Sequence, residues 1–157
     1  MSGARKILVM GLGNPDRGDD GIGPMVAHAL AGRVPSGVRV AARGGDMLSL
    51  IDEWDGVELL VCIDAAEPAG TPGRIRRIDL ATESLPPERG ASSHAFGLAE
   101  AIALARALGT APARIAVYAV EGSDFAVGAE MTPPVAAAVQ DVADRVLAEL
   151  AEMVAHA

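Results

Sequence analysis

The sequence predicts an α/β fold in which helices cover a mostly parallel sheet. Short apolar runs alternate along the chain with segments whose apolar residues recur at helical spacing. Half of the residues are hydrophobic but only 3% are aromatic, so the core is expected to consist mainly of Ala, Val, Leu and Ile. With 157 residues, the chain is expected to form a single domain over 1–157 whose core needs no disulfide.

The first strand is expected over residues 6–11, an apolar run of the kind that is buried on both faces of a sheet. A loop rich in Gly and Asp leads to a helix over 20–30, with Asp19 or Asp20 as its N-cap. The apolar residues expected to face the sheet are Ile22, Met25, Val26, Ala29 and Leu30. His28 lies off this stripe, so we expect it to face solvent.

Two further strands are expected before the middle of the chain. Residues 38–42 alternate apolar and polar side chains, which indicates a half-buried strand near an edge, and 47–53 form a short helix. A third strand is expected over residues 57–67; it becomes wholly apolar and then places Asp64 near its C-terminal end. Cys62, inside this run, is expected to be an inert core thiol.

A polar strand is expected over 74–78. The connection before it is too short for a helical crossover, so this strand should be antiparallel to its neighbour and near the sheet edge. Residues 81–91 are expected to form an exposed loop that could border a substrate, and Ser92 or Ser93 to cap the next helix. The face of that helix expected to be buried comprises Leu98, Ala101, Ile102, Ala105 and Leu108.

The last apolar strand is expected over 113–120, followed by a long loop at the ligand-binding edge of the sheet. The final helix is expected to run to about residue 153, with Thr132 as its cap and Pro133 at its first position. The apolar stripe of this helix comprises Val135, Ala138, Val139, Val142, Val146 and Leu150.

Charge and hydropathy exclude several classes of partner. The net charge is −8 and the basic residues are scattered, so the chain lacks the positive stripe of a nucleic-acid binder. No uncharged apolar run approaches the ~18 residues that span a bilayer, so a membrane location is not expected. One cysteine leaves no internal disulfide and fits a reducing compartment. A soluble, cytoplasmic protein is therefore expected.

The loop after the first strand points to chemistry at the carboxyl ends of the strands. It gathers Asp16, Asp19 and Asp20 among several glycines, at the edge where open α/β sheets bind ligands. It is not a dinucleotide-binding fingerprint, because Asp16 occupies the position of the last glycine and three carboxylates would repel a pyrophosphate.

Three element ends bring Asp20, Asp64 and His94 to one side of a parallel sheet. Two carboxylates and one imidazole leave open positions on a divalent ion such as zinc, nickel or manganese, so the set is a candidate metal site. Taken alone, Asp64 is better explained as a turn or capping residue and His94 as part of a helix cap; the parallel between the two loops favours the metal site. Motifs of zinc proteases, serine hydrolases and thiol enzymes are missing from the sequence.

The chain resembles the hydrogenase maturation proteases, which trim the C-terminal tail of the nickel-iron hydrogenase large subunit. Three motifs carry the resemblance in order and spacing across nearly the whole chain. The first is Gly-Leu-Gly-Asn at 11–14 with Gly-Asp-Asp-Gly-Ile-Gly at 18–23. The second is Ile-Asp-Ala at 63–65 with Pro-Gly at 72–73, and the third is Ser-Ser-His at 92–94.

This resemblance implies a three-layer α/β/α sandwich around a five-stranded sheet. It also implies that Asp20, Asp64 and His94 bind metal, and that the metal is nickel carried by a large-subunit precursor, which the protease cuts near its C-terminus. Zinc and other divalent ions are alternative occupants of the site. Separately from the resemblance, an acidic protein that meets a metal centre through a shallow edge suggests a monomer in a transient one-to-one complex with the precursor. These three residues are also our candidates for catalysis: the ion would polarise the scissile carbonyl or activate water, with one carboxylate as base.

The chain departs from the family pattern at two places. Glu67 stands where the family often has a second Asp, which keeps the charge. Gly45 and Asp46 stand where the family often has Gly-Thr, and Asp46 could alter which precursor is accepted. Asn14, Gly45 and Asp46 are our candidates for contacts with substrate, although a glycine pair here could also be only a tight turn.

Three other readings compete with a protease. A metal-sensing chaperone would bind the nickel-loaded subunit without cutting it, and the same residues would serve. A peptidyl-tRNA hydrolase also opens with Gly-Leu-Gly-Asn-Pro, but the stretch that would supply its catalytic His is Gly-Asp-Asp-Gly here, and the surface is acidic. In a generic α/β domain the Asp and His residues would be caps, which leaves the coincidence of three motifs unexplained.

Overall fold

The computed structural model describes residues 6–44, 46–85 and 97–155. A five-stranded sheet with the order β2-β1-β3-β5-β4 forms its centre. The strands are β1 (Ile7–Leu12), β2 (Val38–Arg43), β3 (Leu59–Ala66), β4 (Ile75–Asp79) and β5 (Arg114–Glu121). Only the β4–β5 pair is antiparallel among these strands, so the mostly parallel sheet and the antiparallel edge strand predicted from the sequence are confirmed.

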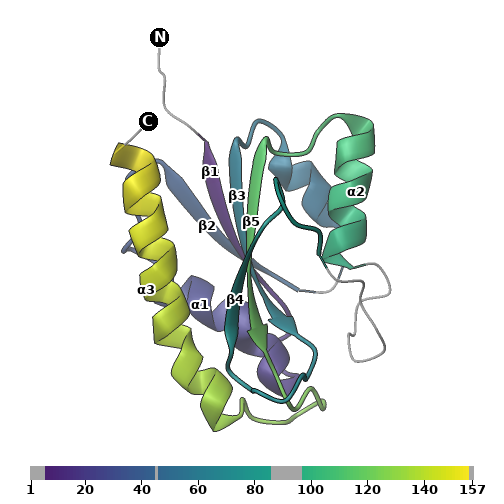
Figure 1. Cartoon of the computed structure of the whole chain (residues 1–157), viewed down its shortest axis with the longest axis vertical. Helices are drawn as coiled ribbons and strands as arrows, with labels where there is room; N and C mark the ends of the chain where they lie inside the picture. Colours follow the sequence, from purple (N-terminus) through teal and green to yellow (C-terminus); the bar gives the residue numbers. More distant parts are fainter. Residues whose placement is uncertain (1–5, 45, 86–96, 156–157) are drawn as a thin grey trace.

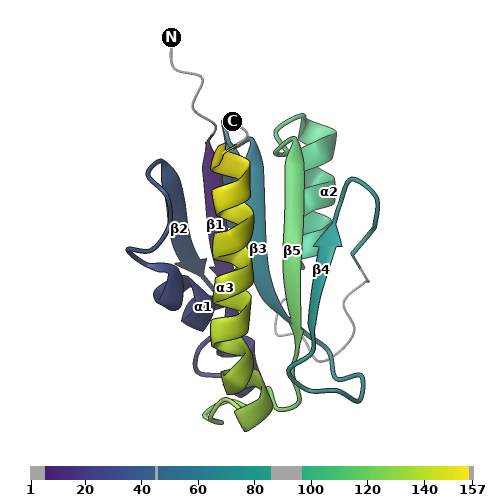
Figure 2. The same cartoon turned by 60° about the vertical axis from the view of Figure 1, so that its left-hand side comes forward.

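Helices cover both faces of the sheet and give three layers (Figure 1). Helices α1 (Ile22–Leu30) and α3 (Pro133–Ala155) pack on one face, and α2 (Leu98–Leu108) lies with the 3-10 helix η2 (Leu48–Trp54) on the other. Figure 2 shows α3 crossing in front of the sheet, with α2 behind it. The fold is thus the three-layer α/β/α sandwich that the resemblance implied.

The sheet separates two hydrophobic layers because side chains alternate along each strand. In β3, Leu60 and Cys62 join the layer under α2 and η2, whereas Val61 and Ile63 join the layer under α1 and α3. The largest side chain of the first layer is the fully buried Trp54, whose indole N–H points at the sulfur of Met10 at 3.4 Å. The inert, buried thiol predicted at Cys62 is also found: burial and, to a lesser extent, the negative charge of Asp64 raise its pKa.

Helix α1 begins in direct contact with the backbone of two strands. A Cβ atom added to Gly23 would lie 2.3 Å from the carbonyl oxygen of Leu12 and 2.6 Å from that of Ile63. Gly11 is equally crowded, since its Cβ would lie 2.0 Å from the carbonyl oxygen of Gly23. Glycine at these two positions therefore lets the start of α1 sit directly over β1 and β3.

Several local predictions about the helices need correction. The N-cap position of α1 is Gly21 rather than Asp19 or Asp20, because both Asp residues belong to the preceding 3-10 helix η1 (Gly18–Gly21). Met25 is 47% exposed, since α1 contacts its neighbours through the row Ile22, Val26 and Leu30.

Helix α2 also differs from the prediction at both ends. Its N-cap position is Gly97, and the predicted caps, Ser92 and Ser93, lie outside the described residues. Leu108 is 62% exposed because it is the last residue of the helix, next to the left-handed Gly109. Of the exposed loop predicted over 81–91, only residues 81–85 are described.

Candidate functional site

The loop after β1 places Asp20 at the carboxyl edge of the sheet. The main-chain N–H of Asn14 donates a hydrogen bond to Oδ2 of Asp20 at 2.9 Å, and only 8% of Asp20 is exposed. Gly13 makes this tight loop possible: its φ is +134°, and an added Cβ would lie 1.9 Å from the carbonyl oxygen of Asp20. The orientation of the Asp20 carboxylate is therefore fixed by the backbone of its own loop.

Asp64 reaches the same edge from β3. It follows Ile63, which pairs with Gly11 of β1, and its Oδ1 accepts the main-chain N–H of Ala65 at 2.9 Å. By strand alternation Asp64 continues the row of Leu60 and Cys62, so it lies on the face covered by α2.

The structure thus brings two of the three predicted ligands to the carboxyl ends of adjacent parallel strands. η1, which carries Asp20, contacts β3, which carries Asp64. Across residues 6–44, 46–85 and 97–155, no three His, Cys, Asp or Glu side chains gather closely enough to hold a metal ion. His94, the third predicted ligand, lies outside the described residues. Carboxylate oxygens suit divalent ions, so the donor set present fits a metal without defining its site.

Asp19, the neighbour of Asp20, has a role that the sequence did not reveal. It is fully buried, and its Oδ2 accepts the main-chain N–H groups of Ser123 and Asp124 at 2.8 and 3.1 Å. Its Oδ1 accepts the main-chain N–H of Thr132 at 2.7 Å, and the Thr132 hydroxyl lies 3.0 Å from Oδ1 and 2.9 Å from Oδ2. The cap predicted at Thr132 is correct in position, because α3 begins at Pro133. Its hydroxyl, however, donates a hydrogen bond to Asp19.

The hydrogen bonds to Asp19 also decide its charge. Burial alone would raise the pKa of the carboxyl, but the N–H groups of Ser123, Thr132 and Asp124 and the Thr132 hydroxyl outweigh it, so the pKa lies below its ordinary value. No local sequence signal could have found these partners, since they lie 104 to 113 positions away along the chain.

Glu121 is a second buried carboxylate at this edge that sequence reasoning missed. It ends β5 and is 6% exposed, and its Oε2 accepts the main-chain N–H groups of Ala69 and Thr71 at 2.9 and 2.6 Å. Its own main chain pairs with Gly73 and Arg74. Glu121 thereby fixes the loop that follows Asp64 and Glu67.

The candidate substrate loop after β2 lies beside the Asn14 loop. The N–H of Gly13 donates to the carbonyl oxygen of Arg43 at 3.0 Å, and a Cβ on Gly44 would lie 2.9 Å from the carbonyl oxygen of Gly13. Gly45 lies outside the described residues. Asp46 is exposed, and its Oδ1 accepts the N–H of Leu48 at 2.9 Å.

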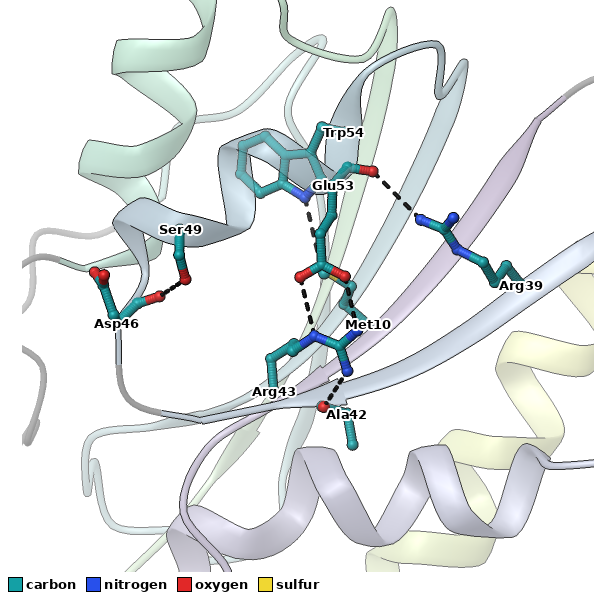
Figure 3. Close-up of polar contacts among 8 residues, drawn as sticks. All are labelled: Met10, Arg39, Ala42, Arg43, Asp46, Ser49, Glu53 and Trp54. Carbon is teal, nitrogen blue, oxygen red and sulfur yellow. Dashed lines mark hydrogen bonds and ion pairs between the residues drawn. The ribbon is translucent and has the colours of Figure 1, made fainter.

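A second set of contacts holds η2 beside this loop (Figure 3). Arg43 forms a bidentate pair with the carboxylate of Glu53, at 2.9 and 2.8 Å, and Ser49 donates its hydroxyl to the carbonyl oxygen of Asp46. The last turn of η2 is therefore tied to β2 through Glu53, and its first turn is tied to Asp46 through Ser49.

The positions of His28 and Cys62 argue against a role in the candidate site as a metal ligand or a nucleophile. His28 is exposed on α1, as the sequence predicted. Cys62 is fully buried with a raised pKa, so its thiol is not a nucleophile in this structure.

Comparison with known proteins identifies the family and agrees with the fold. Residues 24–149 match the family described as hydrogenase maturation protease. The hydrogenase expression/formation protein HupD of Thiocapsa roseopersicina is 30% identical over 155 residues, which cover 94% of this chain and 68% of HupD. The protein of the same name from Bradyrhizobium diazoefficiens is 30% identical over 92% of this chain and 79% of its own length.

Solved structures give the same result. The hydrogenase maturating endopeptidase HybD from E. coli superposes with a TM-score of 0.79 at 26% identity, covering 96% of this chain and 94% of HybD. The [NiFe] hydrogenase maturation protease HybD from Thermococcus kodakarensis has a TM-score of 0.70 at 26% identity, covering 92% and 99%.

The fold and the sequence define a protease of the α/β class. The chain belongs to the hydrogenase maturation protease family. Within the described parts of the chain, no helix combines the length and the apolar character needed to cross a membrane.

Proposed function

We propose that this chain is an endopeptidase that removes the C-terminal extension of a nickel-loaded nickel-iron hydrogenase large-subunit precursor. The observation that carries the proposal is the family match over residues 24–149, joined to the two carboxylates at one sheet edge. The precursor, its nickel and the position of the cut are implied by the family resemblance.

In this proposal Asp20, Asp64 and His94 are the protein's metal ligands. The precursor brings the nickel as part of the substrate, and zinc or another divalent ion can take the same donors. Asp64 supports this assignment because it lies on the sheet face covered by α2, and His94 precedes that helix by only a few residues. A bound ion would polarise the scissile carbonyl or lower the pKa of an attacking water.

The chain's own residues then orient the reaction. The N–H of Asn14 holds Oδ2 of Asp20, so the carboxylate keeps its direction as the precursor docks. One of the two carboxylates, Asp20 or Asp64, accepts the proton of the attacking water, and that proton is passed to the amine of the departing peptide. Asn14, Gly45 and Asp46 border the entering segment, and the acidic Asp46 biases which precursor is accepted.

The proposed partnership is a monomeric protease in a transient one-to-one complex with the precursor. The proposed compartment is the cytoplasm, where a single unpaired cysteine is stable.

The deciding experiment is intact-mass analysis of a candidate large-subunit precursor after incubation with the protein, with and without nickel in the precursor. We expect loss of one C-terminal peptide from the nickel-loaded sample only. Asp20→Asn, Asp64→Asn and His94→Ala should each slow cleavage by at least about a hundredfold, in the range reported for general acid–base groups.

His28→Ala is the matched control for His94→Ala, because it removes an exposed imidazole of α1 that is not among the predicted ligands. If Asp20→Asn cleaves the precursor at the normal rate, Asp20 has no role in catalysis. Binding of loaded precursors without any cleavage would overturn the protease and favour the non-cleaving chaperone.

A further inference from the structure

One carboxylate joins two loops that are far apart in the chain. The loop that carries Asp20 follows β1, and the segment 123–132 follows β5. Asp19 accepts hydrogen bonds from both ends of that segment, from Ser123 and Asp124 on one oxygen and from Thr132 on the other. In return, the N–H of Asp19 donates to the carbonyl oxygen of Asp124 at 2.9 Å.

The loop that carries Asp20 and the segment 123–132 are also packed tightly against each other. Gly18 has φ +55°, and an added Cβ would lie 2.4 Å from the carbonyl oxygen of Asp124. A Cβ on Gly122 would lie 2.9 Å from the Cβ of Asp19. Farther out, the N–H of Gly128 donates to the carbonyl oxygen of Asp16 at 2.7 Å. The segment is therefore attached to the Asp20 loop at both ends and near its middle.

This firmly held segment presents an apolar side chain to solvent. Val127 is 75% exposed, and its neighbours Ala126 and Gly128 are exposed too. Ala126 is fixed through its N–H, which donates to Oδ1 of Asp124 at 3.0 Å. An aliphatic side chain on a turn that is already fixed loses little conformational entropy when a partner contacts it.

We propose that Asp19 is a positioning residue that holds segment 123–132 as a preformed rim for the substrate, with Val127 as a contact for the precursor's tail. The inference rests on the proposed function, since it names a part of the surface that receives the same substrate. An extended tail that crosses the carboxyl edge near Asp20 must pass the loops that follow the strands, and this segment is bonded to the Asp20 loop itself.

Asp19→Asn is the sharpest perturbation of this rim. Both carboxylate oxygens accept main-chain N–H groups, so an amide must direct its NH2 group at one of those donors. Thr132→Val is milder, because it removes the hydroxyl and leaves the main-chain bond. Val127→Asp changes the rim surface without touching the attachment, and Glu149→Gln alters a carboxylate elsewhere in the fold as a control.

The experiment measures kcat and KM for the nickel-loaded precursor and hydrogen exchange of the backbone amides in each variant. For Asp19→Asn we expect the amides of Ser123, Asp124 and Thr132 to exchange at least about tenfold faster, because local opening becomes easier. KM should rise at least about tenfold in Asp19→Asn and about fivefold in Val127→Asp, with kcat changed less than about threefold.

Glu149→Gln should leave KM and these three amides unchanged. If Asp19→Asn does not fold, Thr132→Val and Val127→Asp decide the question through the same KM values. A KM within about twofold of the unaltered protein in the folded rim variants would overturn the rim while leaving the protease intact. Failure of the unaltered protein to cut any loaded precursor would overturn the proposed function, and the rim with it.

Discussion

Two carboxylates of this protein are held in opposite ways. Asp19 is fully buried and takes its hydrogen bonds from main-chain N–H groups and one hydroxyl of the segment 123–132. Glu149, on α3, takes its bonds from side chains of the sheet: Arg77 donates from two nitrogens at 2.9 and 2.6 Å, and the hydroxyl of Tyr118 donates as well. The first carboxylate organises loops, whereas the second attaches a helix to strands.

The difference shows which contacts can be recognised from a sequence and which cannot. Side-chain partners such as Arg77 and Tyr118 must be particular residue types, and they sit opposite each other on paired strands. A main-chain N–H can belong to almost any residue type, so the sequence of the donor segment does not reveal the contact, and only the accepting Asp is recognisable. Replacing the buried carboxylate of Asp19 by an amide therefore sets a donor against main-chain donors, which costs more than separating a partly exposed ion pair.

The largest expected effect comes from Asp19→Asn. One oxygen is replaced by a donor that faces other donors in a buried place, so we expect a loss of about 3 kcal/mol in the free energy of unfolding. Urea unfolding measures it, with the exposed Asp55→Asn as a control that should change stability by less than about 0.5 kcal/mol. A loss as small as the control's would mean that the loops hold together without Asp19.

The next largest loss of stability is expected from Gly18→Ala, which pushes the two loops apart and leaves the carboxylate of Asp19 in place. Gly18→Ala combines a left-handed backbone with a Cβ only 2.4 Å from the carbonyl oxygen of Asp124. We expect a loss of about 2–3 kcal/mol. Gly32→Ala is the matched control, because Gly32 also has positive φ (+77°) but nothing within 4 Å of its Cβ, so only about 1 kcal/mol should be lost. Equal losses in the two variants would show that crowding against Asp124 contributes nothing.

Glu149→Gln should have a smaller effect than either loop variant. The pair with Arg77 is 36% exposed on the Arg side and 16% on the Glu side, so solvent weakens it. We expect a loss of about 1 kcal/mol in urea unfolding. A loss that matches Asp19→Asn would contradict the contrast between main-chain and side-chain partners.

The smallest effect is a difference in acid stability. Burial would raise the pKa of Glu149, but hydrogen bonds from Arg77 and Tyr118 and the charge of Arg77 hold it below its ordinary value of 4.5. The unfolded chain therefore binds this proton first as pH falls, so the stability that Glu149 supplies is complete above pH 4.5 and is lost below it.

Urea unfolding at pH 7 and pH 3 tests this sign. The gap between the unaltered protein and Glu149→Gln should be present at pH 7 and narrower at pH 3, since protonation of Glu149 removes what the variant removes. A gap that widens toward pH 3 would reverse the assigned direction of the shift.

Much of the fold could be predicted because its signals are local. The apolar run of β3 and the apolar stripe of α3 each predict their element from residues that are close together in the sequence. The short connection before β4 predicted that this strand is antiparallel to its neighbour. Helix starts were predicted less well. Asp19 and Asp20 look like caps in the sequence, yet the carboxylate of Asp19 binds the segment after β5, that of Asp20 binds the N–H of Asn14 in its own loop, and Gly21 takes the N-cap position.

The candidate site was predictable only in part. Asp20 follows β1 and Asp64 lies near the end of β3, so the parallel pairing of these two strands puts both residues at the carboxyl edge of the sheet. Their role as metal ligands stays a prediction. The roles of Asp19 and Glu121 depend on loops brought close by the sheet, between residues separated by 50 positions or more. His94 stays a prediction, because it lies outside the described residues.

The separation of the core into two layers gives each layer its own optical reporter. The single Trp54 is buried under α2 and η2, and the single Tyr118 lies in the layer under α1 and α3. Tryptophan emission and tyrosine absorbance therefore record the two faces of one sheet separately. Coincident unfolding curves would show that the sheet melts as one cooperative unit, whereas separated curves would identify the face that loosens first.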